Sequence, residues 1–193
     1  GARGTWSVEC TGGELGMFSF EFVGDYVDAD GAADITDITN PVFETTEPPA
    51  VELAQLWLPQ SSDALQADST TCPSTFSFDM GQDVGIRQCI NAANGYKGAK
   101  INSREPTFSI DPEYIDEGTH GLFEIFEDNQ LWDIGALIGG TTAGNRVAFF
   151  CPQLTTDSMP YADRDGDRIV DLSAVASRLD SDAGCDEICV WIG

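Results

Sequence analysis

Apolar and polar residues alternate with a period of two along most of the chain, which is the pattern of β-strands with one buried face. Residues 5–10 and 18–22 alternate in this way, and Gly12 and Gly13 between them form a turn signal. These two runs predict a β-hairpin over residues 5–24. The same alternation predicts further strands at residues 51–58, 76–80, 98–104, 131–138, 146–154, 168–179 and 186–192.

One segment departs from this period. Asp111 suits the N-cap position of a helix, Pro112 suits its first turn, and apolar residues follow at helical spacing. Gly118 and Gly121 interrupt that spacing. The sequence therefore predicts short helical turns over residues 112–128 that pack on the strands.

The predicted fold class is all-β, or β-rich α+β. We expect eight or nine strands in two packed antiparallel sheets, a sandwich or barrel, with one flanking helix around residues 112–128. Residues 25–50 form a long loop ending on two prolines, and a connection of that length is usually functional or disordered. A second loop is expected at residues 161–167. The length of 193 residues favours one domain, residues 1–193.

The composition adds a strong acidic bias. Asp and Glu number 33 against 9 Lys and Arg, which gives a formal net charge of -24. Such a chain is not expected to bind nucleic acid or an anionic membrane, because it lacks a cationic surface for phosphate groups. Between Arg3 and Arg87 there are 15 acidic residues and no basic one. Two interpretations stay open: a solvated surface adapted to salt, or a face kept negative to repel a polyanion.

Residues with catalytic chemistry are scarce. His120 is the only histidine, and no serine lies in a G-x-S-x-G elbow. The glycine-rich run 139–144 lacks the ending of a phosphate-binding loop and predicts a hairpin turn. We therefore expect a protein that is not an enzyme, with no catalytic, cofactor-binding or metal-binding residues. The six cysteines permit three disulfides, but small buried apolar side chains are the favoured interpretation.

One loop has the composition of a cation site. Four aspartates surround Gly166, namely Asp163, Asp165, Asp167 and Asp171. Alternating carboxylates suit Ca²⁺, although the glycine is misplaced for an EF-hand loop and the bidentate glutamate is missing. Arg164 and Arg168 support the other interpretation, a salt-bridged hairpin loop without an ion.

Several short strings follow one another along nearly the whole chain. They are Gly1 to Thr5, Gly24 to Val27, Phe76 to Gly81, Arg87 to Cys89, Gly95 to Gly98, Arg104 to Glu113, Gly140 to Val147, Pro160 to Gly166 and Asp186 to Ile188. No single string is diagnostic, but their succession resembles the major tail tube proteins of bacteriophages with long, flexible, non-contractile tails.

The resemblance implies a structural protein of the virion, located in the phage tail and assembled in the host cytoplasm. Proteins of this family have two packed antiparallel sheets with a flanking helix. They form rings, which stack into a hollow tube through which the genome is ejected. By this resemblance residues 25–50 would reach the neighbouring ring, and an acidic lumen would let DNA slide without specific binding. Tape measure, tail terminator and distal tail proteins would be partners.

Two matters stay open at this point. Similar proteins carry a further N-terminal region before the position of Gly1, so residues 1–193 would be a shorter relative or the C-terminal part of a longer subunit. A single-domain subunit would form hexameric rings, and a double-domain one would form trimeric, pseudo-hexameric rings. The alternative function is a secreted, Ca²⁺-dependent β-sandwich binding module, based on the Asp163–Asp171 loop, the aromatic residues and the even cysteine count.

Overall fold

The computed structural model describes residues 2–24, 50–52, 54–59, 65–68, 71–92, 95–113, 120–139, 146–179 and 186–193. This part of the chain contains fourteen strands and the helix α2 (Leu122–Glu127). The first seven strands are β1 (Arg3–Thr11), β2 (Met17–Val23), β3 (Gln55–Pro59), β4 (Leu65–Asp68), β5 (Thr75–Asp79), β6 (Gln82–Gln88) and β7 (Tyr96–Arg104). The others are β8 (Thr107–Ile110), β9 (Leu131–Ile138), β10 (Val147–Ser158), β11 (Tyr161–Arg164), β12 (Asp167–Val170), β13 (Leu172–Ala176) and β14 (Cys189–Ile192).

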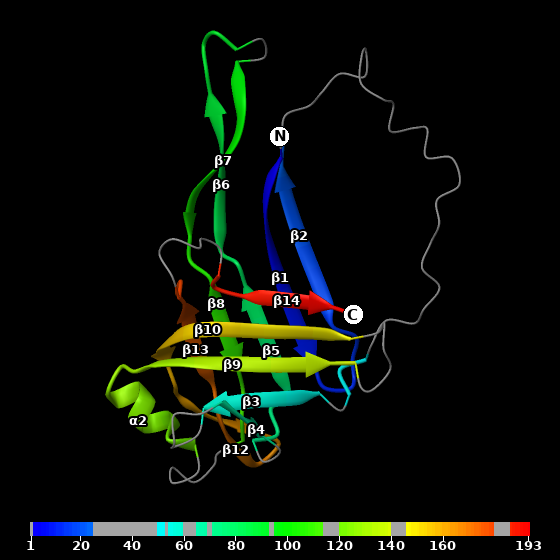
Figure 1. Ribbon diagram of the computed structural model, residues 1–193, viewed down its shortest axis with the longest axis vertical. Helices are drawn as coiled ribbons and strands as arrows, with labels where there is room; N and C mark the ends of the chain where they lie inside the picture. Colours follow the sequence, from blue (N-terminus) through cyan, green and yellow to red (C-terminus); the bar gives the residue numbers. More distant parts are fainter. Residues whose placement is uncertain are drawn as a thin grey trace, which may run out of the picture.

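Ten strands form one antiparallel sheet that folds over into two layers (Figure 1). Its order is β2-β1-β5-β8-β13-β10-β9-β3-β4, and β14 also pairs with β10. Strand β10 belongs to both layers, because residues 147–150 pair with β14 and residues 154–158 pair with β13. The register between β10 and β9 shifts between Cys151 and Leu154, and such an irregularity bends a strand. The predicted pair of antiparallel sheets is therefore confirmed, as two layers of one continuous sheet.

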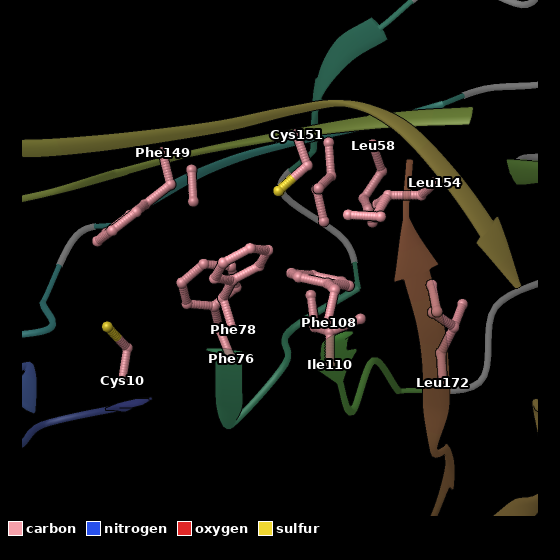
Figure 2. Packing of buried hydrophobic residues seen from close by; sticks show 14 of the residues in the cluster. Cys10, Leu58, Phe76, Phe78, Phe108, Ile110, Phe149, Cys151, Leu154 and Leu172 are labelled. Carbon is pink, nitrogen blue, oxygen red and sulfur yellow. The ribbon is translucent and has the colours of Figure 1, made fainter. Parts of the chain in front are cut away.

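The hydrophobic core lies between these layers (Figure 2). Phe76, Phe78 and Phe108 project from β5 and β8 toward Phe149 and Cys151 of β10. The ring of Phe76 lies 5.4 Å from the rings of both Phe108 and Phe149, measured between centroids. Each of these side chains is buried, and the residue after it on the strand faces outward. The alternation in the sequence is therefore the division between core and surface.

Most expected strands are confirmed, including the short strands β5 and β14, whereas β4, β6, β8 and β11 were not predicted. The hairpin of β1 and β2 and the strand β9 match the expected positions. Strands β4, β8 and β11 have only four residues each, which is too short for a clear period-two signal. The expected strand 168–179 is divided at Asp171 into β12 and β13, so the described strands outnumber the eight or nine predicted.

The expected loop at residues 161–167 is instead a tight hairpin of β11 and β12. Asp165 and Gly166 form its turn, with φ angles of 54° and 96°. Two-residue turns with positive φ at both positions match the twist of antiparallel strands. The prediction of a loop here was wrong because the Asp-Gly turn signal was interpreted as a longer connection.

The predicted helix is confirmed in a shorter form, as α2. Residues 112–113 are not helical, since Glu113 forms a β-bridge with Ile169. Asp111 is not an N-cap: its carboxylate accepts hydrogen bonds from Ser74 and from the backbone of Thr75. Residues 114–119 lie outside the described residues, as do residues 25–49 of the expected long loop.

Two hairpins lie outside the large sheet. Strands β6 and β7 form one of them, here named the arm (residues 82–104), and it projects from one end of the molecule (Figure 1). Strands β11 and β12 form the other. Among the described residues, no helix is long and apolar enough to cross a bilayer.

Candidate functional site

A surface of hydroxyl and carboxylate side chains covers the outer side of β2, β1, β5, β8 and β13. We call it the polar face; its polar members are Thr5, Ser7, Glu9, Ser19, Glu21, Ser77, Asp79, Thr107, Ser109 and Ser173. The strand register places Ser77, Ser109 and Ser173 in one row across three strands. The hydroxyl oxygens of Ser77 and Ser109 lie 2.7 Å apart. The polar face is thus built from segments that are far apart in the sequence.

The charge of the polar face is negative. Glu9, Glu21 and Asp79 are exposed on it, and Arg3 at its end is its only basic residue in the part of the chain that the structure describes. The remaining side chains are mostly short serines and threonines, and Met17 is exposed among them, opposite Glu9. Such a surface repels phosphate groups and offers them a cation only at Arg3.

Strand β2 is an open edge of the sheet. It pairs with β1 on one side and has no strand partner on the other among the described residues. Phe18, Phe20 and Phe22 stack along it, with ring centroids 6.2 Å apart in each step. Phe18 packs on Phe149 of the core, whereas Phe20 and Phe22 are 62% and 69% exposed. An unpaired edge with exposed aromatic rings is a surface for pairing with another chain.

Gly4 allows the outermost ring to lie on the sheet. A Cβ atom at Gly4 would come within 2.5 Å of a ring carbon of Phe22 and 2.3 Å of the Glu21 carbonyl oxygen. Glycine at this position therefore lets the Phe22 ring lie flat across β1. Phe22 therefore packs on the backbone of β1 as well as on Phe20.

The outer side of the second layer is apolar. Its side chains come from β3, β9, β10 and β14 and include Trp57, Leu137, Ala148, Phe150 and Trp191. Leu137, Ala148 and Trp191 are register neighbours across three strands, and Trp191 is 56% exposed. This apolar face lies on the side of the sandwich opposite the polar face, so the two outer surfaces differ in chemistry.

The aspartates proposed for Ca²⁺ lie on the hairpin of β11 and β12. Asp163 accepts a hydrogen bond from the Gly166 backbone N–H at 3.3 Å, which closes the turn. Within the described ranges, no three His, Cys, Asp or Glu side chains are grouped so that they could hold a metal ion. The two arginines act elsewhere: Arg168 lies over the ring of Tyr161, 3.6 Å from its centroid, and Arg164 reaches the body of the protein.

Arg164 is the centre of a polar network. It forms ion pairs of 3.0 Å with both Asp111 and Glu113, and it donates to the Cys72 carbonyl oxygen at 3.1 Å. Burial opposes ionisation of Asp111, but hydrogen bonds from Ser74 and Thr75 and the charge of Arg164 outweigh it and lower the pKa of Asp111. The network ties the β11–β12 hairpin to the ends of β5 and β8.

The described cysteines are unpaired with one another. Cys10 and Cys151 are buried, and burial raises the pKa of Cys10 to about 11 and that of Cys151 to about 12, with smaller contributions from neighbouring Glu9 and Cys189. Both thiols are therefore protonated packing residues at neutral pH, as predicted. Cys72 is exposed, and Cys185 lies outside the described residues.

His120 is a buried residue. It is 2% exposed, and its Nδ1 atom lies 3.4 Å from the carbonyl oxygen of Pro59. His120 is therefore packed inside the protein rather than exposed at a surface site. Reasoning from the sequence predicted β7 at residues 98–104 but missed β6 and the basic character of the arm. The signal for that character was available, because four of the nine basic residues lie between positions 87 and 104.

Comparison with known proteins adds the family. A family model described as phage tail tube protein matches residues 1–176. A solved structure of the Hcp1 protein from the E. coli EAEC 042 pathovar, in a mutated form, is similar at 13% identity and a TM-score of 0.36. That similarity covers 76% of this chain and 99% of the other. The comparison with curated proteins finds no match.

Proposed function

This chain belongs to the phage tail tube protein family, and we propose that its copies assemble into stacked rings that form a hollow tube for DNA ejection. It is a structural component of the virion. The proposal extends this role to self-assembly in the host cytoplasm and to contacts with tape measure, tail terminator and distal tail proteins at the ends and along the lumen of the tube.

The polar face carries the proposal. A channel for DNA needs a wall that repels phosphates and lacks bound cations, so that no position along it retains the polymer. The polar face has three exposed carboxylates, Glu9, Glu21 and Asp79, set among short hydroxyl side chains. We therefore assign the polar face to the lumen. Among the acidic residues between Arg3 and Arg87 that the structure describes, Glu9, Glu21 and Asp79 are the members of the polar face.

The β2 edge and the apolar face supply contacts between copies in a ring. An open strand edge with exposed Phe20 and Phe22 is stabilised when a neighbour pairs with it and covers the rings. Such a contact is heterologous, because the edge of one copy meets a different surface of the next. Repetition about an axis closes the ring and removes the open edge.

Electron microscopy of the purified protein tests the assembly. We expect hollow rings or tubes, with the polar face toward the channel. The rotational symmetry of class averages distinguishes a hexameric ring from a trimeric, pseudo-hexameric one. Monomers at high concentration that do not assemble, in this chain and in any longer form of it, would contradict the proposal.

The charge of the lumen has its own test. Particles carrying Glu9→Lys, Glu21→Lys and Asp79→Lys together are expected to assemble and to eject DNA at least about tenfold more slowly, because Lys side chains bind phosphates. The rate is measured by fluorescence of a dye that binds released DNA. The control is Glu14→Lys with Glu52→Lys and Asp167→Lys, three exposed acids outside the polar face. Equal ejection rates for both variants would rule out the lumen assignment.

A further inference from the structure

A cavity of about 320 Å³ lies at one end of the hydrophobic core, between the two layers of the sheet; we call it the end cavity. Phe76 of β5 and Ile110 of β8 line one side of it, and Leu56 of β3 and Ile138 of β9 line the other. Protein interiors are otherwise close packed, with few spaces larger than a water molecule. A space of this size within the fold is therefore available to a ligand.

The end cavity results from small side chains at facing positions of the two layers. Cys10 lines it from β1 and Ala136 lines it from β9, and both residues are buried. In the centre of the core the same space between the layers is filled by large rings, including those of Phe78 and Phe108, whereas Cys10 lies at the margin of the cluster (Figure 2). The sizes of a few residues thus decide where the layers leave room.

The end cavity has an opening to solvent and a neutral lining. Ala54 and Cys72, which are among the residues that line it, are exposed. The polar residues of the lining, such as Gln55 and Ser74, are uncharged. Among the described residues that line the end cavity, none carries a formal charge. A molecule can therefore enter from solvent, and it meets no ionic partner inside.

The interior of the end cavity disfavours charge. Burial raises the pKa of the Cys10 thiol to about 11, and the charge of neighbouring Glu9 adds to this increase. The thiolate is thus poorly solvated at this position. Burial of a charged group without a partner costs far more than burial of an apolar group. A ligand of the end cavity must therefore be uncharged.

We propose that the end cavity binds a small, uncharged aromatic molecule of about the size of indole. A cavity of about 150 Å³ with apolar walls is large enough for benzene, so roughly twice that volume suits a molecule with two fused rings. The layers of a β-sandwich lie about 10 Å apart, and a flat ring fits between them. Sulfur atoms such as Sγ of Cys10 make favourable contacts with aromatic rings.

A free molecule fits this site better than a side chain from a second copy does. A side chain would bring its own backbone to the opening, where Val51, Ala54 and Pro73 offer apolar surface. Backbone N–H and C=O groups that lose water there without gaining a hydrogen bond are costly. No residue of the polar face or of β2 lines the end cavity. The inference is therefore independent of the proposed assembly.

A titration with indole tests the site. Methyl NMR spectra of the full chain should show saturable shifts at Val51, Ile110 and Ile138, with a dissociation constant of about 0.1–1 mM. At ten times that concentration the melting temperature should rise by about 3 °C. Indole-2-carboxylate, which adds a negative charge, should bind at least about tenfold more weakly. Shifts that do not saturate, or that are confined to Leu137 and Ala148 of the apolar face, would overturn the proposal.

Substitutions that fill the end cavity should remove the binding. Ala136→Leu is expected to weaken indole binding at least about tenfold, because the larger side chain occupies the same space. Cys10→Leu fills the space from the opposite layer, and it decides the matter if the first variant does not fold. Ala99→Leu makes the same chemical change on the arm and should leave the dissociation constant within about twofold of the original. Full binding by both filling variants would contradict the proposal.

A second comparison tests the space itself. Ala174 is fully buried in the core and does not line the end cavity. Ala174→Leu overpacks its surroundings and should lower the melting temperature at least about 5 °C more than Ala136→Leu does. Equal losses for the two variants would show that residue 136 has no free space beside it, and the proposed site would be ruled out.

Assembly assays separate this inference from the proposed function. Folded Ala136→Leu protein should form tubes as the original protein does. If it loses both indole binding and tube formation, the end cavity belongs to an apolar side chain of a second copy, and the proposal of a free ligand is overturned. If the original protein forms no tubes, the proposed function fails. The indole titration still decides the present inference in that case, because it needs only the folded chain.

Discussion

The two hairpins outside the large sheet have the same architecture and opposite surroundings. In the β11–β12 hairpin, Ile169 and Val170 are buried, and the Val170 N–H donates to the Pro112 carbonyl oxygen at 2.9 Å. Arg164 adds ion pairs to Asp111 and Glu113 of the body. In the arm, isoleucines at comparable strand positions are exposed, and polar contacts to the body are concentrated at its base.

This difference shows that the partner of a hairpin decides its role. The β11–β12 hairpin has its partner within the chain, so its side chains contribute to folding stability. The arm has its apolar side and three basic side chains turned to solvent, so they contribute little to folding stability and are accessible to another molecule. Substitutions in the two hairpins should therefore affect different measurements.

The largest contrast is expected for matched isoleucines. Ile169→Ala should lower the free energy of unfolding by about 2–4 kcal/mol, because it removes a buried side chain and leaves a cavity. Ile90→Ala should change it by less than about 0.5 kcal/mol, because Ile90 is fully exposed. Urea denaturation measures both. Similar losses of stability for the two variants would show that the arm packs on the body.

The second-largest loss of stability is expected for a substitution at the junction of the arm with the body. Gly81 has a φ of 55°, and a Cβ atom there would lie 2.2 Å from the Glu105 carbonyl oxygen. Gly81→Ala is expected to cost about 1–3 kcal/mol and to increase hydrogen exchange in β6 and β7.

Gly95 provides the control for that junction. It also has positive φ, at 74°, but nothing lies within 4 Å of an added Cβ atom. Gly95→Ala should cost only about 1 kcal/mol, from backbone strain alone. Equal losses of unfolding free energy for Gly81→Ala and Gly95→Ala would show that the close contact with Glu105 does not contribute.

The smallest loss of stability is expected at Asp111, which pairs with Arg164 of the β11–β12 hairpin. Asp111→Asn should destabilise the protein by about 1–2 kcal/mol at pH 7, because hydrogen bonds to a carboxylate are lost. The folded state lowers the pKa of Asp111, so its contribution is present above about pH 3.9, the usual value for Asp. It is lost as the pH falls through the lower folded value. The difference between the variant and the original protein should therefore shrink from pH 5 to pH 2.

Asp165→Asn is the matched control for this pH dependence. It makes the same chemical change at an exposed turn position of the same hairpin. We expect a change within about 0.5 kcal/mol at every pH. A constant difference for Asp111→Asn across the whole pH range would contradict the role of its charge.

Much of the body could be predicted because a strand with one buried face alternates apolar and polar residues along the sequence. Residues 131–138 alternate clearly and form β9 with those bounds. Strand β6 was missed because Gly85 and the polar residues Arg87 and Gln88 interrupt alternation in a strand whose faces are both partly exposed. Asp111 was misassigned because a local N-cap signal cannot reveal a hydrogen-bond partner 37 residues away, at Ser74.

The strand order decides which side chains lie together on the polar face and on the apolar face. Alternation along each strand shows which side chains face away from the core, since successive residues point to opposite sides of a sheet. It does not show which strands are neighbours, because pairing is a long-range contact. Only the order β2-β1-β5-β8-β13 brings Glu9, Glu21 and Asp79 onto one face, and only the bend of β10 sets the apolar face opposite it. The charge of the arm was present in the sequence, whereas its projection from one end of the molecule came from the tertiary structure.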